Sequence, residues 1–141
     1  MRGVGRASYG SGMVTLEQVS ALVLRLPEVA EDERDGRRSW SVAGKGFAWE
    51  RPFSKADLKR FGDATPPVGP IVAIRVADLG EKEAVLAAGR PGFFTIPHFD
   101  GYSAVLVALP DVHLRDLEEA LEDGWLARAP QRLAEAFLAG R

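Results

Sequence analysis

The sequence contains no cysteine and only two histidines, His98 and His113, among its 141 residues. Without thiols the chain can form neither a disulfide nor a cysteine nucleophile, which is compatible with a reducing cytoplasm. Structural zinc sites are built from cysteine and histidine, so two histidines are too few to supply one. We therefore expect a cytoplasmic protein that holds no metal ion and no other cofactor.

Long apolar segments are also missing. Uncharged segments such as residues 64–74 and 101–110 fall far short of the roughly 18 apolar residues that a membrane-spanning helix needs. Residues 1–12 contain two arginines but no apolar run, so they do not form a secretory signal. We predict a disordered leader at residues 1–12, a single domain at residues 13–141, and no membrane partner.

Charge is nearly balanced overall but unevenly distributed. The 18 basic and 20 acidic side chains leave a net charge of −2, which argues against a uniformly basic surface. Residues 34–60 nevertheless carry eight basic against three acidic side chains, a net charge of +5, whereas residues 111–141 carry four against seven, a net charge of −3. This asymmetry predicts a basic patch on one part of the molecule.

Hydrophobic periodicity predicts helices at both ends of the chain and strands between them. A capping box at Thr15 and Gln18 begins a helix that Pro27 ends. Further segments are expected as follows: a short helix at residues 54–61, a strand at 71–76, a helix at 79–88, extended chain at 93–96, a turn at 97–101, a strand at 102–109, and helices from Asp111 and from Gln131. This order predicts an α+β fold, a mostly antiparallel sheet with helices packed over it.

A β-hairpin is predicted around the glycines at positions 44 and 46. Apolar and polar residues alternate on either side of these glycines, and the alternation places both Trp40 and Trp49 on the buried face. The highly charged residues 28–38 lack apolar periodicity, so they are expected to form a solvated loop leading into the sheet.

Several of these features resemble the MmcQ/YjbR family. The residues that carry the resemblance are Leu26-Pro27-Glu28-Val29, the hairpin from Trp40 to Trp49, Phe93-Phe94, Pro97-His98, Gly101-Tyr102, Trp125, Ala129-Pro130 and Arg132. The resemblance implies a double-wing α+β domain and a DNA-binding role. The family commonly has a lysine after the final proline, where this chain has Gln131, so any phosphate contact at that position is weakened here.

The basic segment yields the first hypothesis, a nucleic-acid interface on the hairpin. Lysine and arginine side chains would contact phosphates, and an exposed aromatic ring would stack on a base. The residues assigned to this role are Arg37, Arg38, Lys45, Arg51, Lys55, Lys59 and Arg60. A protein of this kind is expected to be a monomer or a weak dimer with DNA as its partner.

The aromatic turn at residues 97–102 yields the alternative, a small-molecule or peptide-binding cleft. Its assigned residues are His98, Tyr102, Trp125 and Arg128. His98 could contact a ligand or transfer a proton there, or it could satisfy a backbone group of the turn. An enzyme needs a second titratable group in a recognisable arrangement, and none is found, so no catalytic residue is assigned.

Overall fold

The computed structural model describes residues 13–140, so the predicted leader at residues 1–12 lies outside the described part of the chain. The elements follow in chain order: α2 (Leu16–Val23), β1 (Val29–Arg34), β2 (Arg37–Val42), β3 (Lys45–Glu50), α3 (Lys55–Phe61), β4 (Ile71–Arg75), α4 (Leu79–Ala87), β5 (Phe93–Phe94), the 3₁₀ turn η1 (Pro97–Phe99), β6 (Ala104–Ala108), α5 (Leu114–Arg128) and α6 (Gln131–Ala139). Within this range no helix is long and apolar enough to cross a membrane.

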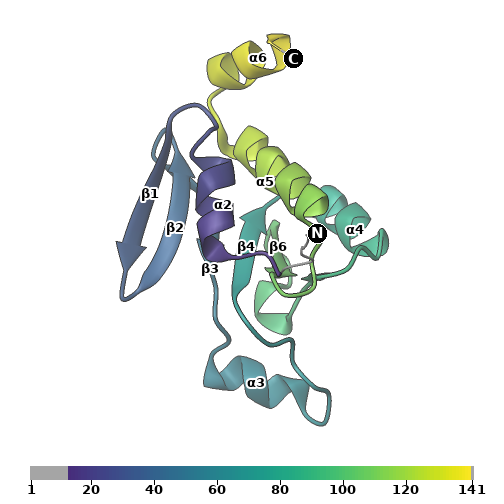
Figure 1. The fold of residues 1–141 in the computed structure, drawn as a ribbon. Helices are drawn as coiled ribbons and strands as arrows, with labels where there is room; N and C mark the ends of the chain where they lie inside the picture. Colours follow the sequence, from purple (N-terminus) through teal and green to yellow (C-terminus); the bar gives the residue numbers. More distant parts are fainter. Residues whose placement is uncertain (1–12, 141) are drawn as a thin grey trace, which may run out of the picture.

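The six strands form one sheet in the order β1-β2-β3-β4-β6-β5, and every neighbouring pair is antiparallel. Helices α2 and α5 lie together against one face of this sheet, whereas α3 lies beyond the end of β3 (Figure 1). The α+β fold with an antiparallel sheet and helices packed over it is therefore confirmed.

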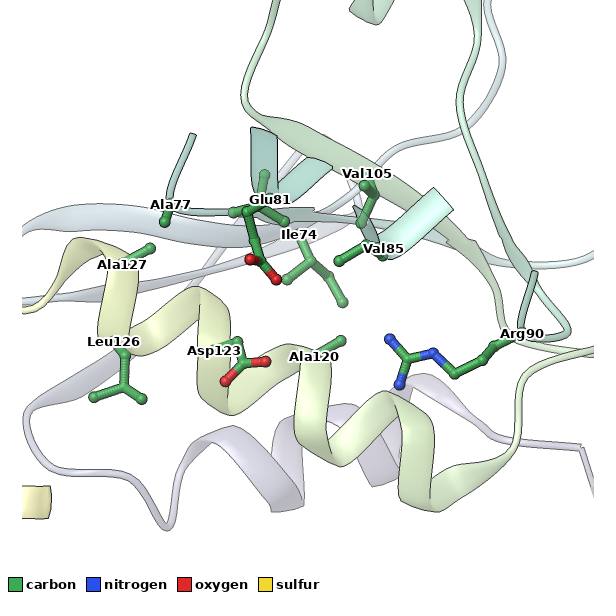
Figure 2. A pocket seen from close by; sticks show the side chains of 11 residues that line it. Ile74, Ala77, Glu81, Val85, Arg90, Val105, Ala120, Asp123, Leu126 and Ala127 are labelled. Atoms are coloured by element: carbon green, nitrogen blue, oxygen red, sulfur yellow. The ribbon is translucent and has the colours of Figure 1, made fainter. Parts of the chain in front are cut away.

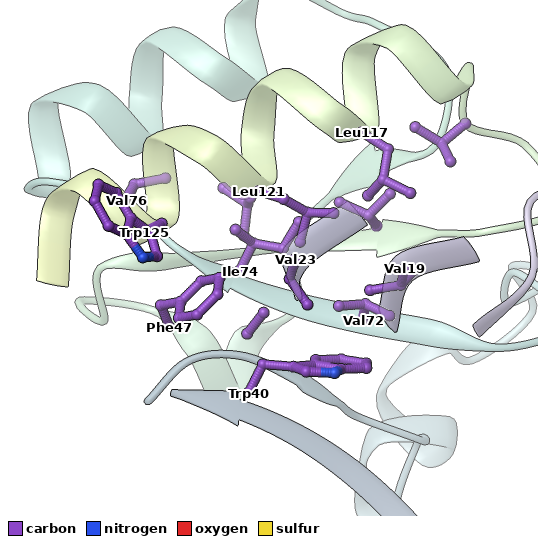
Figure 3. Close-up of a cluster of buried hydrophobic side chains, with 14 of the residues drawn as sticks. Val19, Val23, Trp40, Phe47, Val72, Ile74, Val76, Leu117, Leu121 and Trp125 are labelled. Carbon is purple, nitrogen blue, oxygen red and sulfur yellow. The ribbon is translucent and has the colours of Figure 1, made fainter. Parts of the chain in front are cut away.

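Hydrophobic side chains fill the space on both faces of the central strands. On the face covered by α2 and α5, which we call the helix face, Val72 and Ile74 pack in one core with Trp125 (Figure 3). Because successive strand residues point to opposite faces, Ile71 and Ala73 belong to a second core on the other side. That second core is completed by Phe99 of η1 and by partly buried aromatic residues, which are Phe53 and Phe61 at α3 and Phe94 of β5.

Local sequence signals explain where the first helices begin. The Thr15 hydroxyl accepts from the Gln18 amide at 3.2 Å, and the Gln18 side chain accepts from the Thr15 amide at 2.9 Å. Ser54 and Asp57 form the same reciprocal cap at the start of α3. Each cap satisfies amide donors that the first turn of a helix leaves without partners.

The loop predicted for residues 28–38 is wrong, because this segment forms strand β1 and the start of β2. Asp35 and Gly36 connect the strands as a two-residue turn, both with positive φ (53° and 76°), the conformation that an Asp-Gly pair favours in a tight hairpin. β1 is an edge strand whose side chains are almost all exposed. The sequence of β1 therefore lacks the alternation of apolar and polar residues that indicates a strand. The turn residues Asp35 and Gly36 were the available signal for the hairpin.

Helix α5 approaches the sheet closely at Gly124. A Cβ atom at this position would lie 2.8 Å from Cγ2 of Ile74 and 3.0 Å from the carbonyl oxygen of Arg75. On the same helix, the Trp125 indole donates a 3.0 Å hydrogen bond to the carbonyl oxygen of Pro27, which ties α5 to the connection between α2 and β1. The absence of a side chain at Gly124 sets the distance between helix and sheet.

Replacing Gly124 with alanine is expected to destabilise the fold by about 1–3 kcal/mol, although alanine favours helices more than glycine does. The added methyl group must displace α5 from β4. Gly46→Ala is the control, because an added Cβ there meets nothing within 4 Å and the glycine has no positive φ. Urea denaturation of both variants measures the difference, and equal free energies of unfolding would contradict this account of the contact.

Candidate nucleic-acid interface

The sheet face opposite α2 and α5, which we call the open face, is covered by α3 and η1 only at β4 and β6. On β1–β3 it presents Asp32, Arg34, Arg37, Ser39 and Trp49, since the register pairs Asp32 with Ser39 and Ser39 with Trp49. These side chains surround a shallow hollow of about 420 Å³. In this part of the sheet the helix face is apolar and covered, whereas the open face carries polar side chains and is accessible for binding.

A β-bulge turns Trp49 toward this face. Trp40 pairs with Ala48 and Ser41 with Gly46, so Phe47 is an extra residue in β3. An extra residue shifts the alternation by one position. Phe47 and Ala48 consequently both lie in the helix-face core, whereas Trp49 packs beside the open-face core and is half-buried. The predicted burial is thus confirmed for Trp40, which is 1% exposed, and wrong for Trp49.

The aromatic turn brings a second aromatic ring to Trp49. Tyr102 is 42% exposed, and its ring lies edge-on to the Trp49 ring with centroids 6.3 Å apart. The Arg75 guanidinium lies 4.9 Å from the centroid of the Tyr102 ring and donates a 2.8 Å hydrogen bond to its hydroxyl. Trp49, Tyr102 and the exposed His98 line a hollow of about 300 Å³ with Arg51 and Phe99.

A buried lysine of α4 fixes the shape of this turn. The Lys82 ammonium donates to the carbonyl oxygens of Phe99 and Tyr102 at 2.5 Å and 2.8 Å. Burial lowers the pKa of Lys82, and the Asp100 carboxylate raises it in part. Two carbonyl acceptors compensate for the removal of this charge from water, so the turn has a defined conformation before any ligand binds.

Arg51 is held in place by the start of α3. Its guanidinium lies 3.0 Å from the buried carboxylate of Asp57 and 5.6 Å from the centroid of the Phe99 ring. Burial alone raises the pKa of Asp57, but hydrogen bonds from Ser54 and Arg51 outweigh it, so the pKa is lowered. The carboxylate therefore stays charged and fixes the arginine beside the hollow.

The structure brings most of the predicted basic residues to one end of the sheet, where β2 begins and β3 leads into α3 (Figure 1). Arg37 is exposed on the open face, and the cations of α3 are exposed on its surface: Lys55, Lys59 and Arg60. Two predicted residues do not join them. Arg38 points to the helix face, where it contacts Glu17 at 3.0 Å and Ser20 at 3.3 Å. Lys45 pairs with Val42 at the opposite end of the hairpin, roughly 16 Å along the strand from Arg37.

The predicted cleft joining His98, Tyr102, Trp125 and Arg128 is not formed. Trp125 is fully buried in the helix-face core, where its ring lies 4.9 Å from the ring of Phe137. Arg128 follows it on α5, on the other side of the sheet from the turn. Trp125 follows Leu117 and Leu121 at helical spacing on the core side of α5, and that placement excludes it from the hollow.

Sequence reasoning missed three residues of this interface: Arg34, Arg75 and Lys82. Arg34 stands next to the overlooked Asp35-Gly36 turn, which was the signal for its position. Arg75 ends an apolar strand, and only the three-dimensional pairing places it beside Tyr102. Lys82 lies between two glutamates in a helix, a pattern typical of a solvated surface, so no local signal indicated its burial.

Comparison with known proteins identifies relatives in mycobacteria. "Uncharacterized protein Rv2570" of Mycobacterium tuberculosis and "Uncharacterized protein Mb2600" of Mycobacterium bovis are each 46% identical to this chain over 130 residues. The alignment covers 90% of this chain and 98% of each relative. No family model and no solved structure matches the chain.

Replacing Asp57 with asparagine is expected to lower stability at neutral pH by about 1–3 kcal/mol and to weaken its dependence on acid. The folded carboxyl has a lower pKa than the unfolded one, whose usual value is 3.8, so its stabilisation is complete above that pH. That stabilisation is lost as pH falls through the folded pKa. Urea denaturation from neutral pH to about pH 2 measures this loss. Asp63→Asn, at an exposed position, is the control, and parallel acid limbs for D57N and the parent would contradict the assignment.

Proposed function

The chain belongs to the same family as these mycobacterial proteins, and we propose that it binds single-stranded nucleic acid on the open face of its sheet. The observation that carries the proposal is the pairing of two accessible aromatic rings, Trp49 and Tyr102, with arginines on one face. The DNA-binding role that the MmcQ/YjbR resemblance implies is consistent with this proposal. We propose that this chain and its mycobacterial relatives are of the MmcQ/YjbR type.

Unpaired bases are the part of a nucleic acid that fits this face best. A duplex hides the faces of its bases in the stack, whereas single strands expose them to aromatic side chains. Trp49 and Tyr102 are available for such stacking, and Arg34 and Arg37 are placed to contact phosphates beyond Trp49. Asp32, Asp35 and Glu50 line the same hollow as these arginines, so the positive charge is largely offset there. We therefore expect micromolar affinity rather than the tighter binding of a broadly basic protein.

A second candidate function is the binding of a small molecule or peptide in the hollow of about 300 Å³ beside Tyr102. The specific observation in its favour is the preformed shape of this hollow. Lys82 fixes one wall through two backbone carbonyls, and Asp57 fixes Arg51 in another. Such a ligand would bind at Tyr102 without contacting Arg37, which distinguishes this function from nucleic-acid binding.

Fluorescence polarisation with a labelled oligothymidylate and a duplex of equal length tests the main proposal. The single strand is expected to bind more tightly than the duplex. Its affinity is expected to fall with salt, with a log–log slope of roughly −0.7 for each phosphate that the protein neutralises. No binding of the single strand at low salt, or a clear preference for the duplex, would refute the proposal.

Two substitutions locate the interaction. Trp49→Leu is expected to weaken single-strand binding by about 1–3 kcal/mol, the free energy of stacking one base on an aromatic ring. Arg37→Gln is expected to reduce the salt slope by about one phosphate contact, whereas Lys45→Gln removes the same charge at the far end of the hairpin and is expected to leave it unchanged. Thermal melts establish that the variants are folded. Equal effects of the two charge substitutions would show that binding does not involve the open face.

A further inference from the structure

A separate pocket lies on the helix side of the sheet, between β4, β6, α4 and α5. Its volume is about 330 Å³, at the lower end of the range for small-molecule sites. Ile74, Val85 and Val105 form its apolar wall (Figure 2). Ile74 and Val72 face the same core, so this pocket is on the opposite side of the sheet from Trp49 and Tyr102.

Two carboxylates enter this pocket from different helices. Glu81 extends from α4 and Asp123 from α5, and both side chains point into the space between the helices (Figure 2). Within residues 13–140, neither carboxylate forms a hydrogen bond or a salt bridge. Burial raises the pKa of Asp123, and the carboxylates of Glu119, Glu122 and Glu81 raise it further, while Arg90 lowers it. Both residues are nevertheless exposed to water, so a cation from solution can reach the two carboxylates.

Arg90 reaches the same pocket, but its charge is already engaged. Its guanidinium lies 2.7 Å from the Glu119 carboxylate and 3.7 Å from that of Asp116. It also lies 4.7 Å from the centroid of the Phe93 ring. A bound anion would have to compete with these partners and approach Glu81 and Asp123, so the pocket favours a cation.

We propose that this pocket binds a small organic cation, with an ammonium group between Glu81 and Asp123 and an apolar body against Ile74, Val85 and Val105. The apolar wall and the unpaired carboxylates together match the two parts of such a molecule. A divalent metal ion fits less well, because such ions need several oxygen ligands. The described residues contain no group of three acidic or histidine side chains arranged to hold one.

Isothermal titration calorimetry with 2-phenylethylamine at neutral pH tests the proposal, and 2-phenylethanol is the neutral probe of matched shape. The amine is expected to bind. The alcohol is expected to bind at least about tenfold more weakly, because it cannot form the charged hydrogen bond. Asp123→Asn and Glu81→Gln are each expected to weaken amine binding by about ten- to hundredfold. Asp123→Asn also removes repulsion between carboxylates, so this variant is expected to fold.

Glu83→Gln provides the matched control, because Glu83 is exposed on the same helix, as Glu81 is, but does not line the pocket. It is expected to leave amine affinity unchanged. Three results would each overturn the proposal: absence of amine binding, equal affinity for amine and alcohol, or equal losses in Glu81→Gln and Glu83→Gln.

Discussion

Strands β4 and β6 pair along their full lengths with apolar side chains on both faces, and neither face can be left to water. Burial of apolar area is the main favourable contribution to folding, so each face requires its own cover. On the helix face, α5 supplies that cover at close range because Gly124 has no side chain. On the open face, η1 and α3 cover only the central strands, which leaves β1–β3 accessible. The proposed nucleic-acid interface lies beside η1 and α3 on the open face, and the proposed cation pocket lies beside α5 on the helix face.

Much of the fold follows from local sequence signals. The reciprocal caps at Thr15 and Ser54, the apolar strands and the spacing along α5 each act within a few residues, so they can be read without the structure. β1 could not be found in this way. β1 has a neighbouring strand on one side only, so its side chains bury little apolar surface and can be charged. Its stability comes from pairing with β2. The Asp35-Gly36 turn was its only local signal.

The site was less predictable, because its geometry depends on non-local features. The spacing of two residues between Phe47 and Trp49 indicates one face, yet the bulge against β2 places them on opposite faces. Lys82 has the sequence context of a surface residue, and only the fold places the carbonyls of the turn beside its ammonium. Trp125 and His98 were assigned to one cleft, but α5 packs on one face of the sheet and η1 on the other, so the two residues lie on opposite sides.

Helix α4 touches both sites through adjacent residues. Glu81 lines the pocket toward α5, and Lys82 holds the turn that carries His98 and Tyr102. A ligand that displaces α4 from the pocket side must therefore also move Lys82, which holds the turn. Thermodynamic linkage requires the effect to be reciprocal: the factor by which the first ligand changes the affinity of the second equals the factor by which the second changes the first. The pocket and the turn thus share one helix as a structural support.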